Sequence, residues 1–189
     1  MHYPKKWEKE ILLKNGKKVV LRPELPTDTE MLWEMFSTLS TASLDNLVEP
    51  FTRERIEGWT NNIDYDKNLP ILALVEEKEK ARIIGSASLS FYSTEANRHK
   101  TELGITIHDD YQNLGLGTIM ISHLLDIARK KGLKKVFLLV NTTNSRAIQV
   151  YGKCGFRIEA KLEKEHFREG KLEDDYRMAI FLSETANRG

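Results

Sequence analysis

The spacing of hydrophobic residues changes along the chain, and each spacing predicts a different element. Between Gly117 and Lys131 the apolar residues recur every three or four positions, which predicts a helix that buries one stripe. Gly132 follows at the position where a C-terminal helix cap is usual. Val136–Val140 is a nearly continuous apolar run, typical of a central strand covered on both faces. The predicted buried stripe consists of Met120, Ile121, Leu124, Leu125 and Ala128.

The first part of the chain predicts a hairpin followed by a helix. Asn15-Gly16 lies between two short apolar runs, Ile11–Leu13 and Val19–Leu21, and this arrangement is a strong hairpin signal. Thr27, followed three residues later by Glu30, has the pattern of a capping box, so we expect a helix to begin there. The apolar residues of that helix are Met31, Leu32, Met35, Phe36 and Leu39.

Strands and helices alternate over the remainder of the chain. The expected helices are Thr52–Asn61 and about Asn144–Lys153, and the expected strands are Ile71–Glu76, Ile83–Tyr92, Thr101–His108, Phe156–His166 and Asp175–Phe181. The last two strands would pair as a final hairpin. This order predicts one α/β domain over residues 1–189, with a mixed sheet and helices on both of its faces.

Composition argues against several classes of function. The 189 residues carry a net charge of +1 and no long basic run, so we expect no nucleic-acid partner. No run of 18 apolar residues occurs, and we therefore expect no membrane-spanning helix. Cys154 is the only cysteine, so no intrachain disulfide can form, and with five scattered histidines we expect no metal site. Together these features favour a cytoplasmic protein.

A glycine-rich turn carries the clearest chemical signal. Tyr111–Thr118 follows a strand-like run and opens the long helix, and it contains Gly115 and Gly117. The first N–H groups of a helix have no internal partner, and the helix dipole adds positive charge there. Because glycine lets the backbone approach a ligand closely, we expect the main chain of this turn to bind a phosphate or pyrophosphate.

Two blocks resemble the GNAT superfamily of N-acetyltransferases. In the first block, residues 102–117, Gln112, Gly115 and Gly117 match the acetyl-coenzyme A signature of that family. The second block, residues 144–156, resembles the family's pattern of Asn, Ala-Ile, Tyr and Gly-Phe. The similarity is clear over residues 70–181 and looser over residues 1–69. It implies a single GNAT-like domain with a mixed, mostly antiparallel sheet of six to seven strands, in which residues 70–181 bind acetyl-CoA and residues 1–69 form the acceptor side.

The resemblance also implies a set of cofactor contacts. Main-chain amides of Asn113, Leu114, Gly115, Leu116, Gly117 and Thr118 would hold the pyrophosphate, in a loop that begins at Gln112. The main chain of Ile105, Thr106 and Ile107 would pair with the pantetheine arm. Asn144 would contact that arm from the other side, and Tyr151 would lie near the sulfur as the acid that protonates the departing thiolate. No metal is implied, and direct attack needs no covalent acyl-enzyme.

Alternative roles stay open for four residues. Tyr151 has helical spacing with Ala147 and Ile148 and could be a core tyrosine instead of the acid. Glu102 resembles a strand glutamate that acts as general base, directly or through water, but a solvated sheet carboxylate fits equally. His108 is expected to be a strand-end residue rather than a base, and Cys154 a packing residue rather than a nucleophile.

The expected reaction is acetyl transfer to a primary amine, either a protein N-terminus or a small amine. A dinucleotide-binding site fits poorly, because Met120 occupies the third glycine position of that fingerprint. A non-catalytic acyl-CoA sensor is the remaining alternative, and a homodimer is compatible with the family. The acceptor would dock against the N-terminal helices, the loop Ser40–Pro50 and the last hairpin. Acidic residues that could attract it are Glu49, Glu54, Asp64 and Asp66.

Overall fold

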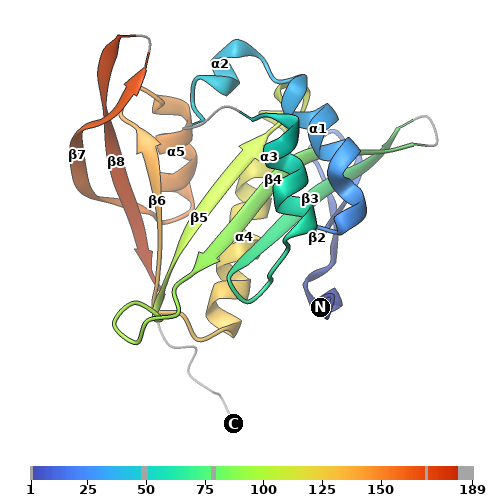
Figure 1. Cartoon of the computed structure of the whole chain (residues 1–189), viewed down its shortest axis with the longest axis horizontal. Coiled ribbons are helices and arrows are strands. Elements are labelled where there is room, and N and C mark those ends of the chain that lie inside the picture. The colour runs from blue at the N-terminus through green and yellow to red at the C-terminus, as the bar shows by residue number, and fades with distance from the viewer. Residues whose placement is uncertain (1, 48–50, 78–79, 169, 183–189) are drawn as a thin grey trace.

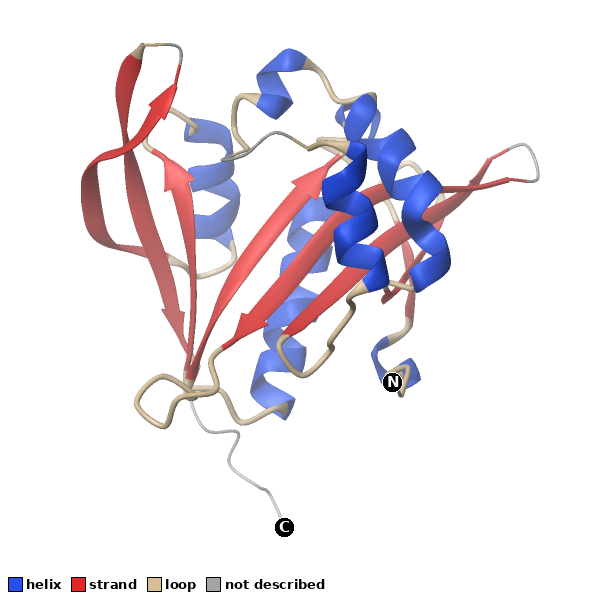
Figure 2. Ribbon diagram, viewed as in Figure 1, coloured by secondary structure: helices blue, strands red, loops and turns tan. Residues whose placement is uncertain are grey.

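The described residues form one eight-stranded sheet (Figures 1 and 2). The computed structural model describes residues 2–47, 51–77, 80–168 and 170–182. The strand order is β1-β2-β3-β4-β5-β6-β8-β7. The strands are β1 Lys9–Leu12, β2 Lys18–Pro23, β3 Asn68–Glu77, β4 Lys80–Phe91, β5 Lys100–Ile107, β6 Lys135–Asn141, β7 Arg157–Arg168 and β8 Lys171–Phe181. Eight strands is more than the six to seven expected, while the mixed α/β class is confirmed.

Helices cover both faces of this sheet. The α-helices are α1 Thr29–Ser37, α2 Thr41–Leu44, α3 Arg53–Asn61, α4 Leu116–Lys130 and α5 Ser145–Lys153. Short 3₁₀ turns lie at Lys5–Trp7, Pro26–Asp28 and Asp109–Tyr111. Figure 1 shows α1 and α3 in front of the sheet and α4 behind it. Most predicted elements agree with these bounds to within a few residues.

The sheet divides between β5 and β6, the one parallel pair among the described strands. The two strands pair only at Lys100↔Lys135, Thr101↔Val136 and Glu102↔Phe137, whereas β4 and β5 stay paired as far as Gly85↔Ile107. Beyond Glu102 the two strands diverge, as Figure 1 shows. Backbone groups on this edge of β5 therefore have no neighbouring strand, and a ligand can take that place.

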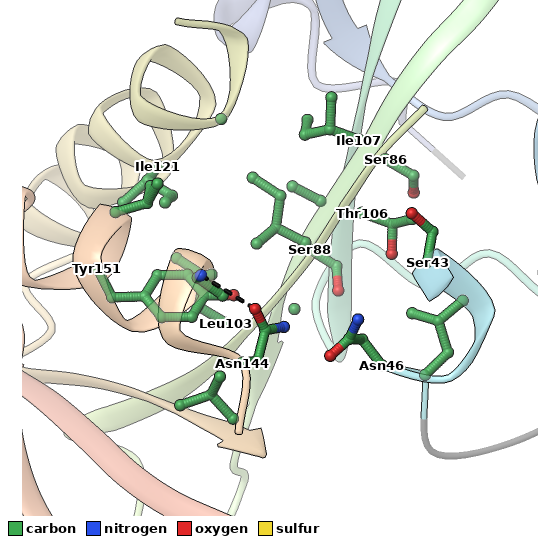
Figure 3. Close-up of a pocket in the computed structure, with 18 of the residues that line it drawn as sticks. Ser43, Asn46, Ser86, Ser88, Leu103, Thr106, Ile107, Ile121, Asn144 and Tyr151 are labelled. Carbon is green, nitrogen blue, oxygen red and sulfur yellow. Dashed lines mark hydrogen bonds between the residues drawn. The ribbon is translucent and has the colours of Figure 1, made fainter. Parts of the chain in front are cut away.

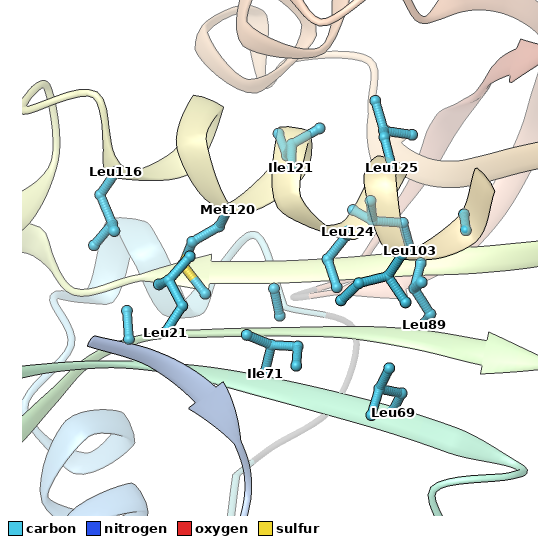
Figure 4. Packing of buried hydrophobic residues seen from close by; sticks show 14 of the residues in the cluster. Leu21, Leu69, Ile71, Leu89, Leu103, Leu116, Met120, Ile121, Leu124 and Leu125 are labelled. Carbon is cyan, nitrogen blue, oxygen red and sulfur yellow. The ribbon is translucent and has the colours of Figure 1, made fainter. Parts of the chain in front are cut away.

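Two hydrophobic clusters hold the layers together. The larger one lies under α4, whose predicted stripe is buried as expected and packs on Leu21, Ile71 and Leu103 (Figure 4). The smaller cluster joins α1 and α3 to the opposite face of the sheet through Leu32, Ile56 and Leu72, among others. Each cluster buries one face of a helix, which is the main source of helix stability in a protein.

The start of α1 differs from the prediction. The expected capping box of Thr27 and Glu30 does not form. The helix starts at Thr29, after a 3₁₀ turn, with Asp28 as its cap residue. The Asp28 carboxylate accepts hydrogen bonds from Leu25 N–H at 2.7 Å and from both terminal nitrogens of Arg22. A buried carboxylate with a charged partner stabilises this turn more than the hydroxyl of Thr27 could.

Candidate active site: a cavity at the split in the sheet

A cavity of about 1140 Å³ lies at the split between β5 and β6 and reaches the helices on the front face. Figure 3 shows Tyr151 and Asn144 on one side of it and Ser43 and Asn46 on the other. The expected site residues that line it are Ile105, Thr106, Ile107, Gln112, Asn113, Gly115, Gly117, Thr118, Asn144 and Tyr151. The three others, Leu114, Leu116 and Glu102, are absent from its wall. The side chains of Leu114 and Leu116 pack against the larger core instead.

The glycine-rich turn presents a row of free amides. Gly115 caps α4 with a φ of +88°, and Asn113 has a φ of +64°. Within the described chain, no hydrogen bond uses the N–H groups of residues 113–118. Positive φ values on either side of Leu114 bring these amides toward one side, where an anion can accept from several of them.

The hairpin of β1 and β2 supports this turn. Lys14 N–H donates to Leu114 O at 3.2 Å, and the Lys14 side chain lines the cavity. This part of residues 1–69 thus lies against the turn expected to bind the coenzyme, although that whole segment was expected on the acceptor side. Arg146 and Lys153 of α5 line the same cavity. Lys14 lies beside Gly115 and Arg146 donates to Gln112 Oε1, so these two cations lie at the turn, where phosphate groups could bind.

The free edge of β5 has backbone groups available for a ligand. Gln112 Nε2 donates to Ile107 O at 3.2 Å, so this carbonyl points away from β4. Because backbone groups alternate along an antiparallel strand, Ile105 N–H and C=O also point away from β4. The main chain of Thr106 faces β4, and its side chain lines the cavity.

Helix α5 contributes Asn144 and Tyr151. Asn144 caps the helix by accepting from Ala147 N–H at 3.1 Å, which leaves its amide nitrogen available. Burial raises the pKa of Tyr151 to about 12. Among the described residues nothing is hydrogen-bonded to its hydroxyl, which differs from a core tyrosine with a bonded hydroxyl. Tyr151 is therefore protonated at neutral pH and able to donate into the cavity.

The side chains of Glu102, His108 and Cys154 contact other groups of the protein. The Glu102 carboxylate accepts from the Tyr92 hydroxyl at 3.3 Å, so contact with an acceptor would need a bridging water. His108 is buried, with Nε2 3.0 Å from Arg82 and 3.1 Å from Thr38.

Cys154 packs against the larger core, and burial raises the pKa of its thiol. A thiol held in its protonated form is a weak nucleophile. Cys154 is therefore a packing residue rather than a nucleophile, as expected.

Asp109 joins the two sides of the cavity. Its carboxylate accepts from Ser40 N–H at 2.8 Å and from the Ser43 hydroxyl at 2.6 Å, and both serines belong to the segment around α2. Gln112 Nε2 donates to the same carboxylate at 3.3 Å, and Gln112 Oε1 accepts from Arg146. The short helix α2, which the sequence pattern did not indicate, is thus fixed to the turn before α4.

Of the expected acidic residues on the acceptor side, only Asp64 lines the cavity. Glu54 and Asp66 are exposed, and Glu49 lies outside the described residues. Two unexpected acids, Glu24 and Asp175, also line the wall, and both are almost fully buried. Neither falls in a recognisable motif, so only the three-dimensional arrangement reveals them.

Glu24 is held rigidly in the wall. Its N–H donates to Pro70 O at 3.1 Å, and its C=O accepts from the Tyr65 hydroxyl at 2.5 Å. Burial, and then the charge of Asp28, raise the pKa of Glu24 to about 7 against the opposing effect of Arg22. The carboxyl group therefore ionises near neutral pH, unlike an ordinary surface glutamate.

Glu24→Gln is expected to stabilise the protein in a pH-dependent way. Since the folded-state pKa lies above the unfolded-state value, the contribution of Glu24 to stability is full below about pH 4.5 and is lost as pH rises through 7. The neutral amide of the variant avoids this loss. The difference in free energy of unfolding between Glu24→Gln and wild type should therefore grow by about 2 kcal/mol between pH 5 and pH 8. Urea unfolding at both pH values measures it, with Glu10→Gln on the exposed β1 as control. Equal advantages at the two pH values would contradict the argument.

Comparison with known proteins identifies the family. Residues 30–156 match the model of the acetyltransferase (GNAT) family. The chain is 30% identical over 135 residues to acetyltransferase PA5475 of Pseudomonas aeruginosa, covering 70% of this chain and 71% of that protein. It is 34% identical over 85 residues to the ribosomal protein bS18-alanine N-acetyltransferase of Escherichia coli, covering 44% and 56%.

A solved structure has the same fold. The spermidine N-acetyltransferase of Vibrio cholerae, in complex with CoA and spermine, superposes with a TM-score of 0.73 at 23% identity, covering 88% of this chain and 96% of the other. The chain belongs to the GNAT family of acetyltransferases. It is an N-acetyltransferase with acetyl-CoA as its co-substrate, as the sequence resemblance implied. In the described residues, no helix is long and apolar enough to cross a bilayer.

Proposed function

We propose that the protein transfers the acetyl group of acetyl-CoA directly to a primary amine while both substrates are bound. The free amides of residues 113–118, at one end of a cavity that Tyr151 lines, carry this proposal. Lys14, Arg146 and Lys153 would supply positive charge at the phosphate end. Holding both substrates in one cavity can contribute ~7–11 kcal/mol through proximity.

Protein groups would assist each change of charge. As the C–N bond forms, the developing oxyanion would accept from the free Ile105 N–H on the edge of β5, a contribution of about 3 kcal/mol. As the C–S bond breaks, the Tyr151 hydroxyl would donate its proton to the departing thiolate. The amine would lose its proton to Glu102 through a bridging water. Asn144 would position the arm of the coenzyme with its free amide nitrogen.

The acceptor would be a protein N-terminus or a small amine. Named relatives act on ribosomal protein bS18 alanine and on spermidine, which supports an amine acceptor of either kind. Thiol release from acetyl-CoA, measured across peptides, polyamines and simple amines, tests the proposal. Tight acetyl-CoA binding with no turnover for any amine would favour the alternative of a non-catalytic acyl-CoA sensor. Sedimentation would test the homodimer that remains compatible with the family.

Glu102→Gln is expected to lower the transfer rate about tenfold or more and to remove the acidic limb of the pH–rate profile, because the amide cannot accept a proton. The profile of kcat/KM for wild type and variant measures this. Glu95→Gln makes the same charge change on an exposed loop residue and should leave the profile unaltered. Superimposable profiles for wild type and Glu102→Gln would exclude Glu102 as the base.

A further inference from the structure

Two side chains of opposite charge on the β7–β8 hairpin each have one buried atom without a hydrogen-bond partner among the described residues. Asp175 is 3% exposed; its Oδ2 lies 3.1 Å from His166 Nε2, while its Oδ1 is buried and unpartnered within the described chain. Arg168 Nη1 is also buried and has no hydrogen-bond partner within the described chain. The Nε of Arg168 lies 3.9 Å from Glu173, too far for a hydrogen bond. Both residues line the cavity.

The two groups do not satisfy each other. No ion pair joins Asp175 and Arg168 in the described part of the chain, although both face the same space. Nearby polar groups are already used, because Asn141 Nδ2 donates to Glu173 at 2.8 Å. A buried polar atom without a partner is destabilising, so an unpartnered carboxylate oxygen and an unpartnered guanidinium nitrogen on one wall indicate a ligand that supplies a partner to each.

Both residues belong to the last hairpin, which was expected on the acceptor side. Asp175 pairs in register with Asn141 at the end of β6, the strand that borders the split. Arg168, near the end of β7, pairs with Lys171 of β8, which is four residues before Asp175. His166 pairs with Glu173, between these two positions. The cations assigned to the phosphate end, Lys14, Arg146 and Lys153, belong to the β1–β2 hairpin and to α5. Asp175 and Arg168 therefore come from a different element than these cations and the glycine-rich turn.

We propose that Asp175 and Arg168 form a subsite for an α-amino-carbonyl group: Asp175 Oδ1 accepts from the acceptor's ammonium, and Arg168 Nη1 donates to the carbonyl oxygen, three bonds away from that nitrogen. This inference rests on the proposed function. Both a free amino acid and a peptide N-terminus carry this pair of groups. A polyamine or simple alkyl amine offers donors only and would leave Arg168 unsatisfied. His166 holds the Asp175 carboxylate in its orientation.

The test compares acceptors that differ in the carbonyl group. Ala-Ala-Ala should exceed n-butylamine in kcat/KM at least thirtyfold, and L-alanine shows whether a free carboxylate can replace the peptide carbonyl. Arg168→Met should lower kcat/KM for Ala-Ala-Ala about tenfold and leave n-butylamine unchanged, since only the first uses the guanidinium. Asp175→Asn should lower both. Lys171→Met and Glu165→Gln, exposed positions on the same hairpin, are the matched controls.

Calorimetry separates this subsite from catalysis. Ala-Ala-Ala is titrated into the protein saturated with CoA, and its Kd should rise at least tenfold in Arg168→Met and in Asp175→Asn. If turnover is absent but this pattern holds, the proposed function fails and the subsite stands. If Ala-Ala-Ala does not bind, binds like n-butylamine, or binds both variants like wild type, the subsite is wrong. Should Asp175→Asn not fold, Arg168→Met decides alone.

Discussion

Gly115→Val is expected to weaken acetyl-CoA binding at least a hundredfold. The φ of +88° at Gly115 is strained for any residue with a Cβ, and most of all for a β-branched one. Relaxing this strain would rotate the amides of the turn away from their common side and remove several hydrogen bonds to the pyrophosphate. Isothermal titration of acetyl-CoA into wild type and variant measures the change.

Two controls separate the loss of the anion site from general damage. S-acetylpantetheine has the thioester but no pyrophosphate, so its weak binding should be unchanged. Gly132, just beyond the other end of α4, has a φ of +75° and open space around it. Gly132→Val should therefore cost similar stability without affecting acetyl-CoA. Equal Kd values for Gly115→Val and Gly132→Val would remove the glycine-rich turn from cofactor binding.

Tyr151→Phe is expected to lower the rate of acetyl transfer at least tenfold while acetyl-CoA binding stays within twofold. The change removes only the hydroxyl, which is free to donate into the cavity and stays protonated because its pKa is raised to about 12. Without that donor the thiolate must leave unprotonated. Single-turnover kinetics at saturating amine measures the chemical step directly.

Tyr176→Phe provides the matched control, because Tyr176 packs against the same core but does not line the cavity. Its rate should equal that of wild type. With an acetyl thioester whose leaving thiol has a lower pKa, the difference in transfer rate between wild type and Tyr151→Phe should shrink, because a better leaving group needs less protonation. An unchanged rate in Tyr151→Phe would assign the residue to packing.

Periodicity in the sequence predicted the elements with strong patterns. The stripe of α4 and the apolar run of β6 are both buried on the expected faces because each carries many apolar residues at one period. The prediction failed where single polar contacts decide the structure. Asp28 replaces Thr27 at the start of α1 because its carboxylate is shared with Arg22, a residue outside the local window. Helix α2 is only four residues long and carries no periodic signal.

The residues of the candidate site also differ in whether the sequence could predict them. Residues in the two family-like blocks, such as Gly115 and Tyr151, could be found from order and spacing. Glu24, Arg168 and Asp175 could not, because none lies in a recognisable motif. Glu24, just after β2, becomes unusual through its burial, and Arg168 and Asp175 through buried atoms without partners. Glu102 shows the converse: alternation puts it on the same face of its strand as Gly104 and Thr106, which line the cavity, but Glu102 itself does not, and its carboxylate accepts from the Tyr92 hydroxyl.

The carboxylate of Asp109 has a kinetic consequence. It accepts hydrogen bonds from Ser40 and Ser43, so the segment around α2, on the proposed acceptor side, is tied to the turn that is proposed to bind the diphosphate. We therefore expect compulsory-order kinetics: acetyl-CoA enters first and orders this segment, the amine follows, and free CoA departs last. Product-inhibition patterns would reveal this sequence, with CoA competitive against acetyl-CoA alone.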